Sequence, residues 1–571
     1  MPITPTYPGI YIEELPNLSH SVTPAPTSIT VFIGYTHPFQ TPAANFGTPV
    51  EIFGPGDYQA NFGGSFDLNP WLPDYLGNAV FQFFENGGNH AWVVGLKTSG
   101  FVDASGQPIT DAHGNHVTLS PAAITFDMSP SAAPATVTVT LTAQQPGGID
   151  PANHNAASGT LTRVQLANQK KSSAAAPDND IADIIITYGT LSETYRAVAA
   201  KDIAASLGQS ALVAVTVNRA AATDEPASFP GTLQDNGDLA YTVAPPANST
   251  LLNPHDYGQV FNDGQPLDVD VQIFNLMVLP GISPVSDQQD GVLSAALAYC
   301  ERKRAFFIMD APPNATTTGV GPAPTGTPLG TPTRVTMDNF WKGHTAQAAP
   351  PVSANGAIYF PYLETIDQAS GNPIISPPSG YVAGIFARED VAVSVGKAPA
   401  GLETTLLGTT GVVPWGRMTD NQQGTLNLDG VNCLREFPGL GPPVVFGART
   451  LVSSNPAFQQ WKYVPVRRTA LFLEQSLYGS LGWAVFQPND TPLWNALTQT
   501  VEAFMLSLFR QGSFFQGSTP SEAFLVRCDS TTTTPTDQQN GVVNILVGFA
   551  PLKPAEFVVI QIAQLAGQTQ T

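Results

Sequence analysis

The sequence is poor in charged residues. Of its 571 residues only 12% are Asp, Glu, Lys or Arg, about half of the roughly 25% that is usual in soluble proteins. Basic residues are scarcer than acidic ones: the chain has 23 Lys and Arg but 44 Asp and Glu, which gives a net charge of −21. Such a chain repels phosphate backbones, which excludes nucleic acid as a partner. Protein-binding surfaces shed charge, so the sparse charge favours self-association.

Cysteine is scarcer still. Cys300, Cys433 and Cys528 lie far apart and form no CxxC pair, so we expect no disulfide framework and assembly in a reducing compartment. The opening residues MPITPTYPGIYIEEL lack the basic and apolar regions of a signal peptide. No apolar run approaches the ~20 residues that a membrane helix needs, so we expect no direct membrane insertion.

Motifs for catalysis and cofactor binding are also missing. The sequence has no HExxH, GxxxxGK[ST] or GxGxxG, and Ser379 does not lie in a GxSxG elbow. His113 and His116 could hold a metal, but their Asp, Gly and Asn neighbours favour a solvated turn. The acidic residues at 178–183 and 268–270 resemble fragments of a calcium loop without its Gly and terminal Glu. We therefore expect no enzyme, no cofactor and no metal site.

The length predicts three or four domains, and the N-terminal one has an α/β pattern. We expect a strand at residues 28–35, a helix at 75–85 that Gly87 and Gly88 close, and a strand at 91–96. The pattern changes over residues 101–265, which are rich in Thr, Ala, Asp and Asn. This stretch reads as an inserted, mostly β domain.

Within the insertion, short alternating runs predict strands at residues 135–142 and 211–217. Residues 181–188 could form a further strand, and residues 195–207 could form a helix.

The α/β pattern resumes after the insertion. Residues 271–279 (VQIFNLMVL) predict a strand with both faces covered, and a capping box of Ser286 and Gln289 predicts the start of a helix. The helix ends in cations at residues 302–304, which suit a helix C-terminus, and a strand follows at 305–310.

The C-terminal region has one strongly amphipathic helix. Thr491 and Pro492 predict its first residues and Gly512 its end. Strands are expected at residues 544–549 and 556–565. The apolar stripe of the helix is formed by Leu493, Leu497, Val501, Phe504 and Leu508.

The acidic excess is confined to the first three-quarters of the chain. Residues 1–434 carry 15 Lys and Arg against 36 Asp and Glu, whereas residues 435–571 carry eight of each sign. Two interpretations stay open. The C-terminal part is a more buried domain, or it faces other protein while the acidic part faces water. Arg467 and Arg468 form a short basic cluster in this part of the chain, for which contact with an acidic protein surface is a candidate role.

Both ends of the chain predict adhesive strands. Each apolar strand would be an aggregation site if it stayed uncovered, so its own fold or another subunit must cover it. Pairing with a neighbour would add ~4–8 hydrogen bonds per strand at a net ~1 kcal/mol each, and repetition over a lattice would make the link strong. The candidate subunit-linking residues are Gly9, Ile10, Tyr11, Ile12 and Glu13 at one end, and Phe557, Val558, Val559, Ile560 and Ile562 at the other.

Specific segments over residues 1–100 and 266–571 resemble a known family. They are YPGIYIEE at 7–14, SITVFIGY at 28–35, residues 83–94, PPSGYVAGIFARED at 377–390, KAP at 397–399, LNLDGVNC at 426–433, FGARTL at 446–451, YVPVRRTALFLEQSL at 463–477, WAVFQPNDTPLW at 483–494, residues 524–529 and NGVVNILVGFAPLKPAEF at 540–557. In these segments the chain resembles the contractile tail sheath proteins of myophage tails and of related bacterial contractile injection systems. Residues 101–265 do not match, which fits the variable outward-facing insertions of that family.

The resemblance implies an α/β and α+β multidomain protein: an α/β sheath core with an inserted β-rich domain, an α+β C-terminal domain, and extended strand arms at both ends. The family is often described as having a subtilisin-like domain, but no Ser/His/Asp triad can be placed here, so no protease activity is carried over. The expected domains are an N-terminal linking arm at 1–22, the α/β sheath domain at 23–100 and 266–434, the inserted outer domain at 101–265, the C-terminal inner domain at 435–555 and a C-terminal linking arm at 556–571.

The resemblance also implies partners and a mechanism. Subunits would stack as hexameric rings around an inner tube, contact baseplate and tail-terminator or cap proteins, and contract to drive the tube through a target envelope. Arg467 and Arg468 would be candidates for contact with the tube or a neighbouring subunit. Assembly would take place in the bacterial cytoplasm, within a phage tail or a phage-tail-like particle that is released or membrane-anchored. Two alternatives remain: a static tail or fibre protein, and a secreted hydrolase with a β-rich binding module.

Overall fold

A computed structural model describes most of the chain as two compact units. The large unit comprises residues 27–392 and 398–464, and the small unit comprises residues 1–26, 393–397 and 465–571. The described residues are 20–66, 68, 71–103, 107–110, 114, 116–119, 121–129, 136–145, 162–171, 180–188, 191–230, 238–239, 250–282, 291–311, 315–316, 319–320, 353–368, 371–514, 519–557 and 559–560.

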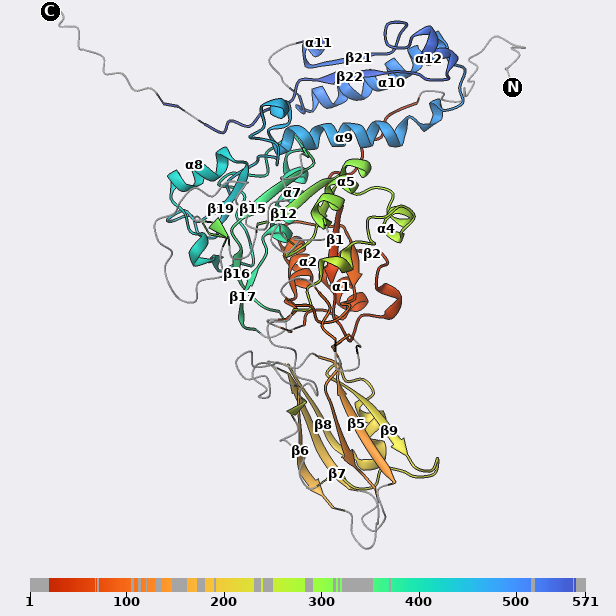
Figure 1. Ribbon diagram of the computed structural model, residues 1–571, viewed down its shortest axis with the longest axis vertical. Coiled ribbons are helices and arrows are strands. Elements are labelled where there is room, and N and C mark those ends of the chain that lie inside the picture. Colours follow the sequence, from red (N-terminus) through yellow and green to blue (C-terminus); the bar gives the residue numbers. More distant parts are fainter. Residues whose placement is uncertain are drawn as a thin grey trace, which may run out of the picture. The chain divides into compact units, whose positions relative to one another are not determined.

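The large unit is built on an eight-stranded sheet (Figure 1). Its order is β2-β3-β1-β11-β12-β15-β19-β20, and the six inner strands are all parallel, while β2 and β20 pair antiparallel at the two edges. The strands are β1 (Thr30–Tyr35), β2 (Val50–Ile52), β3 (Ala91–Leu96), β11 (Leu276–Val278), β12 (Phe306–Asp310), β15 (Gly356–Phe360), β19 (Val431–Arg435) and β20 (Val444–Val445).

Helices cover both faces of this sheet, as parallel strands require. On one face Phe32 of β1 contacts Phe83 of α2 (Tyr75–Glu85), and Phe306 of β12 contacts Phe386 of α7 (Ser379–Ala392). On the other face the alternate residues of the same strands join one core with the stripe of α5 (Val292–Lys303). The shorter helices of the unit are α1 (Pro55–Phe62), α4 (Pro266–Asp270) and α8 (Asp420–Leu428).

Helices α2 and α7 pack closely because one of them carries glycine at the contact. A Cβ on Gly380 would lie 2.5 Å from the Cα of Ala79, and one on Gly384 would lie 2.6 Å from the Cβ of Asn86. Both positions therefore require glycine for the two backbones to approach.

The α/β predictions are largely confirmed. The helix at 75–85 and the strand at 91–96 have the predicted bounds. The strand expected at 271–279 is wrong in length, because only Leu276–Val278 is a strand. The carbonyl of Ile29 accepts the N–H groups of both Asn275 and Leu276, so regular pairing starts only there. The capping box at residues 286–289 lies outside the described residues.

The inserted region forms two antiparallel sheets around its own core. Strand β5 (Val137–Ala143) has alternating buried residues, as expected where one face of a sheet is covered. The core runs from Ala122 to Phe229 and includes Ile203 and Leu207 of α3 (Ile203–Leu207). The sheets are β4-β5-β9, with β4 (Ala123–Asp127) and β9 (Val213–Arg219), and β10-β6-β7-β8, with β6 (Thr162–Lys170), β7 (Ile181–Tyr188), β8 (Leu191–Ala199) and β10 (Asp238–Leu239).

The predicted limits of the insertion are too wide. Val102 and Thr250 exchange backbone hydrogen bonds of 2.8 and 2.9 Å, and Phe101, Leu251 and Tyr257 lie in the core of the α/β sheet. The two flanks of the predicted stretch 101–265 therefore belong to the α/β body, because their apolar side chains are buried there.

The helix predicted at residues 195–207 is also wrong over most of its length. Residues up to Ala199 belong to β8, which pairs with β7 around a register shift, and Ala197 has a left-handed φ of 52° at that irregularity. Only Ile203–Leu207 is α-helical.

The C-terminal domain starts later than predicted. Residues 435–464 belong to the large unit, because β20 pairs with β19 at the edge of its sheet. The remaining short strands of the large unit are β13 (Ala315–Thr316), β14 (Gly319–Val320), β16 (Leu363–Ile366), β17 (Pro373–Ser376) and β18 (Gly411–Val412).

The small unit packs two long helices beneath a two-stranded sheet. The predicted stripe of α10 (Thr491–Arg510) is buried as expected, but the N-cap is Asp490 and not Thr491. Among the described helices, none is long and apolar enough to cross a bilayer. The other elements of the unit are α9 (Val464–Ser480), α11 (Pro520–Ala523), β21 (Phe524–Arg527), α12 (Pro535–Gln539) and β22 (Leu546–Phe549).

Candidate linking surfaces

The described part of the C-terminal arm exposes its apolar side chains. Phe557 is 71% exposed, Val559 82% and Ile560 80%, and residues 552–557 and 559–560 belong to no strand of the described chain. The predicted linking residues Val558 and Ile562 lie outside the described residues. Exposure of three large apolar side chains within four positions is unfavourable in water. A second sheet could cover them.

The root of this arm is fixed to the small unit. The N–H of Ala550 donates to the carbonyl of Ala523 at 2.8 Å, and Pro551 forms an antiparallel bridge with Phe514. The described residues of the arm that belong to no strand therefore begin directly after Pro551.

The N-terminal linking residues Gly9, Ile10, Tyr11, Ile12 and Glu13 lie outside the described residues, but the root of their arm is described. Val22 is buried in the core of the small unit with Phe504 and Leu508. Two serines on one face of α9 then hold the backbone of the root, with Ser480 Oγ accepting from Thr23 N–H at 3.0 Å and Ser476 Oγ from Ala25 N–H at 2.9 Å.

Sequence reasoning missed this anchor. Its signal was the spacing of Ser476 and Ser480, because residues four apart share one face of a helix. Their hydroxyls supply the backbone of residues 23–25 with partners that a neighbouring strand would otherwise provide. Before the anchor, the ring of His20 stacks on Trp483 with a centroid separation of 3.8 Å and an interplanar angle of 7°.

The small sheet has two strands in the described part of the chain. Strands β21 and β22 pair antiparallel from Phe524 opposite Phe549 to Arg527 opposite Leu546. One face packs on the helices, whereas Leu525 and Leu546 are 45% and 50% exposed. A two-stranded sheet is marginal by itself and leaves backbone groups at its edges open to pairing.

Arg467 and Arg468 lie on the first turns of α9. Arg468 is only 4% exposed, and Arg467 pairs with Glu474 at 3.1 Å on the same helix. Their proposed contact with a tube or neighbour therefore stays a prediction, and in the single chain both side chains are engaged within it.

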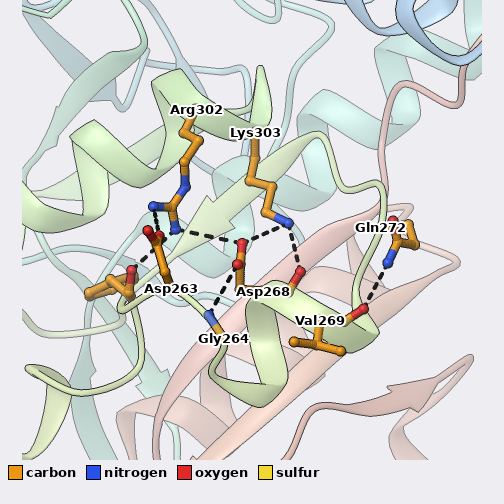
Figure 2. Close-up of polar contacts among 8 residues, drawn as sticks. Asp263, Gly264, Asp268, Val269, Gln272, Arg302 and Lys303 are labelled. Carbon is orange, nitrogen blue, oxygen red and sulfur yellow. Dashed lines mark hydrogen bonds and ion pairs between the residues drawn. The ribbon is translucent and has the colours of Figure 1, made fainter.

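The cations at the end of α5 form an ion-pair cluster, shown in Figure 2. Lys303 Nζ lies 2.9 Å from Asp268 Oδ1, and Arg302 reaches both Asp263 and Asp268. The hydrogen bond from Lys303 is the main cause that lowers the pKa of Asp268. Arg304 is itself the C-cap in a left-handed conformation. The cations thus join α5 to α4 and do not serve only the helix terminus.

The ion-pair cluster also occupies the residues 268–270 that resemble a fragment of a calcium loop. The Asp268 carboxylate accepts from Lys303 and from the N–H of Gly264, so cations and backbone of the chain already satisfy it. No group of three or more metal-binding side chains occurs in the described part of the chain.

One serine and one carboxylate meet in the large unit. The hydroxyl of Ser379 donates to Asp310 Oδ2 at 2.7 Å, its N–H donates to Oδ1 at 2.9 Å, and Gly281 N–H adds a third bond. Both side chains are fully buried, and burial raises the pKa of Asp310 to about 7. Because both the N–H and the hydroxyl of Ser379 donate to Asp310, the pair fixes the start of α7.

Comparison with known proteins adds a fold assignment. Neither protein-family models nor curated protein sequences gave a match. Solved structures did. A chain of the anti-feeding prophage baseplate is similar over 98% of this chain and 99% of its own, with 19% identity and a TM-score of 0.53. This chain has the sheath-protein fold.

Two sheath structures support that assignment. The sheath complex of an extracellular contractile injection system, PVC, in the contracted state matches over 99% of both chains, with 20% identity and a TM-score of 0.51. The contracted helical sheath of the anti-feeding prophage matches over 98% of this chain and all of its own, again with 20% identity and a TM-score of 0.51. The resemblance read from the sequence is therefore confirmed at the level of the fold.

Proposed function

We propose that this protein is the structural subunit of a contractile sheath, which polymerises around an inner tube and contracts to drive the tube through a target cell envelope. The observation that carries the proposal is the near-complete coverage, in both directions, between this chain and chains of contracted sheaths. A match of whole chains includes every domain and supports a shared architecture beyond one common module.

Strand exchange between copies is the linkage that we propose. The two-stranded sheet of β21 and β22 has backbone edges to offer, and the C-terminal arm exposes Phe557, Val559 and Ile560. An arm from one copy would complete the sheet of the next by β-augmentation, with the N-terminal arm serving a second neighbour. Each strand is a modest link, and two per subunit in a closed lattice give strong avidity.

Contraction would then be a change of packing without loss of connection. Linking strands would stay paired while the bodies of the subunits rearrange, and the work would be stored in assembly as the difference between two packings of one sequence. The buried, hydrogen-bonded pair of Asp310 and Ser379 offers a solvent-exposed substrate nothing to react with, so we propose a structural role without catalysis.

The partners on this proposal are other copies of the chain in hexameric rings, the inner tube protein, and baseplate and terminator or cap proteins. The particle would assemble in the bacterial cytoplasm and belong to a phage tail or a phage-tail-like injection particle.

Electron microscopy of the purified particles tests this function. Hollow cylinders of two lengths and two diameters are expected, the shorter being the wider, because contraction conserves the subunits. Cylinders of one fixed length under all conditions would favour the static tail or fibre protein. Monomers at high concentration would contradict both.

A further inference from the structure

One aromatic side chain of the small unit is fully exposed. Phe486 lies between α9 and α10 and is 101% exposed, whereas large aromatic residues are usually at least half covered. Its backbone φ is +67°, which is uncommon for a bulky residue. Exposure and backbone strain both cost free energy in the isolated chain, so we expect that Phe486 has a function that offsets this cost.

The strain arises from the turn that holds Phe486. Gln487 N–H donates to the carbonyl of Ala484 at 3.2 Å, and Val485 has φ −67° and ψ 133°. With φ +67° at Phe486 these values describe a type II turn, whose third position normally takes glycine or asparagine. Phe486 therefore occupies a turn position that favours a residue without a bulky side chain.

Hydrogen bonds fix the chain after the turn. Asn489 donates to the carbonyl of Val542 at 3.0 Å, accepts from the indole N–H of Trp494 at 2.9 Å, and receives a bond of 2.6 Å from Gln538 on its carbonyl. These hydrogen bonds hold the chain three residues after Phe486, so the exposed side chain lies beside a fixed segment.

The surroundings have the composition of a protein interface. Residues 475–489 contain no charged side chain, although the chain as a whole is acidic. Val485 is 61% exposed and Tyr478 73% exposed in the same stretch. Uncharged surface with protruding aromatic residues is typical of the centre of a protein–protein contact, where Phe and Tyr are enriched and charge is depleted.

The root of the N-terminal arm indicates which partner covers this surface. His20 stacks on Trp483, three residues before Phe486. His20 lies seven positions after Glu13, the nearest predicted linking residue, so the arm can reach at most about 25 Å before it pairs. The copy that receives the arm must therefore lie close to the Phe486 turn.

We propose that the Phe486 turn docks on a second copy of this chain, the same copy that receives the N-terminal arm. This inference rests on the proposed function, because it takes strand exchange between copies as given. It adds a rigid aromatic contact beside each arm, which would fix the angle at which a paired neighbour sits.

Substitutions that suit the turn test the proposal without unfolding the chain. Phe486→Gly and Phe486→Asn relieve the left-handed backbone, so the melting temperature of the isolated subunit should stay the same or rise. The concentration needed for assembly into cylinders should rise at least about tenfold, as for loss of an interface anchor. Assembly of both variants at the wild-type concentration would overturn the proposal.

Photo-crosslinking identifies the occupant. With p-benzoylphenylalanine at position 486, irradiated particles should give a covalent dimer of this chain, and the same group at Leu191 in the insertion serves as control. A crosslink to a different protein, such as the tube, or no crosslink at all, would overturn the inference. Absence of any cylinders from the wild-type chain would instead contradict the proposed function, so the two failures are distinguishable.

Discussion

The α/β body and the small unit bury their apolar residues to different degrees. In the body, every residue of β1, β12, β15 and β19 is buried, and helices cover both faces of the sheet. In the small unit, a two-stranded sheet, an exposed arm and an exposed aromatic turn leave large apolar side chains in water. The difference teaches that the large sheet is covered within one chain, whereas the small sheet and its arm have surfaces that neighbours could cover.

Removal of an arm should have the largest effect. Deletion of residues 1–15 or 556–571 should abolish assembly into cylinders and leave the melting temperature of the soluble subunit unchanged, because the proposed arms pair with neighbouring copies and Phe557, Val559 and Ile560 are exposed in the single chain. The deletion ends at residue 15 so that the anchor around Val22 is kept. Size-exclusion chromatography and electron microscopy measure both outcomes.

A variant of full length sharpens that experiment. Replacing Phe557, Val559 and Ile560 by Ser keeps the length of the arm and removes its apolar groups, so assembly should again be lost. Lys553→Ser is the matched control and should assemble normally. Normal cylinders from the triple variant would show that assembly does not need the apolar groups of the arm, and would contradict the contrast between the two units.

A matched pair of Leu→Ala substitutions compares the two regions directly. Leu293 of α5 is fully buried in the body, and its truncation should lower the free energy of unfolding by about 2–5 kcal/mol. Leu546 of β22 is 50% exposed, and its truncation should change the stability of the isolated subunit by less than about 1 kcal/mol. Urea denaturation measures both. Equal losses would mean that Leu546 is covered within the isolated subunit and would contradict the contrast.

Local patterns predicted most of the body but not its long-range connections. The helix at 75–85 was readable because its apolar positions and its closing Gly87 lie together in sequence. The return of the chain at Thr250 to pair with Val102 was not readable, because the two residues are 148 positions apart. Alanines around Ala197 favoured a helix, and pairing with β7 overrode that preference.

The candidate linking surfaces were predicted only in part. The apolar character of residues 557–560 is local and was visible in the sequence. The anchor of the N-terminal arm was not, because Val22 and Ser480 meet only after α9 has formed. The exposure of Phe486 was equally hidden, since a turn type follows from backbone angles and its sequence lacks the usual glycine.

Part of the pH dependence of the body can be traced to Asp310. Burial raises the pKa of Asp310 to about 7, whereas an unfolded aspartate titrates near ~3.9. Between these values the folded state holds a proton that the unfolded state has released, so stability falls as pH rises from about 4 to 7. Tyr75 and Tyr362 lie near the same carboxylate, and burial, together with the charge of Asp310, raises the pKa of both phenols, so both stay neutral beside it.

Asp310→Asn should flatten this dependence. The amide imitates the protonated acid, so the melting temperature should drop by about 2–4 °C less between pH 5 and pH 8 in the variant than in the wild type. Asp74, whose pKa burial raises to about 8, leaves a residual slope in both proteins. An unchanged slope in the variant would show that Asp310 stays ionised in the folded body.

Removal of the insertion should have the smallest effect on assembly. Val102 and Thr250 are already paired, so a short Gly-Ser turn can replace residues 104–248 and close the chain there. Cylinders should form at the wild-type concentration, although the loss of partly buried Ile109, Val117 and Leu119 should lower the melting temperature of the body. Loss of cylinders from a folded variant would place the insertion within the lattice.

Cryo-electron microscopy of the assembled particle tests the central claim most directly. Residues 9–13 and 557–562 of each chain should lie as added strands beside β21 and β22 of neighbouring copies. If both segments pair within their own chain in the particle, the small unit completes itself and the proposed linkage is contradicted.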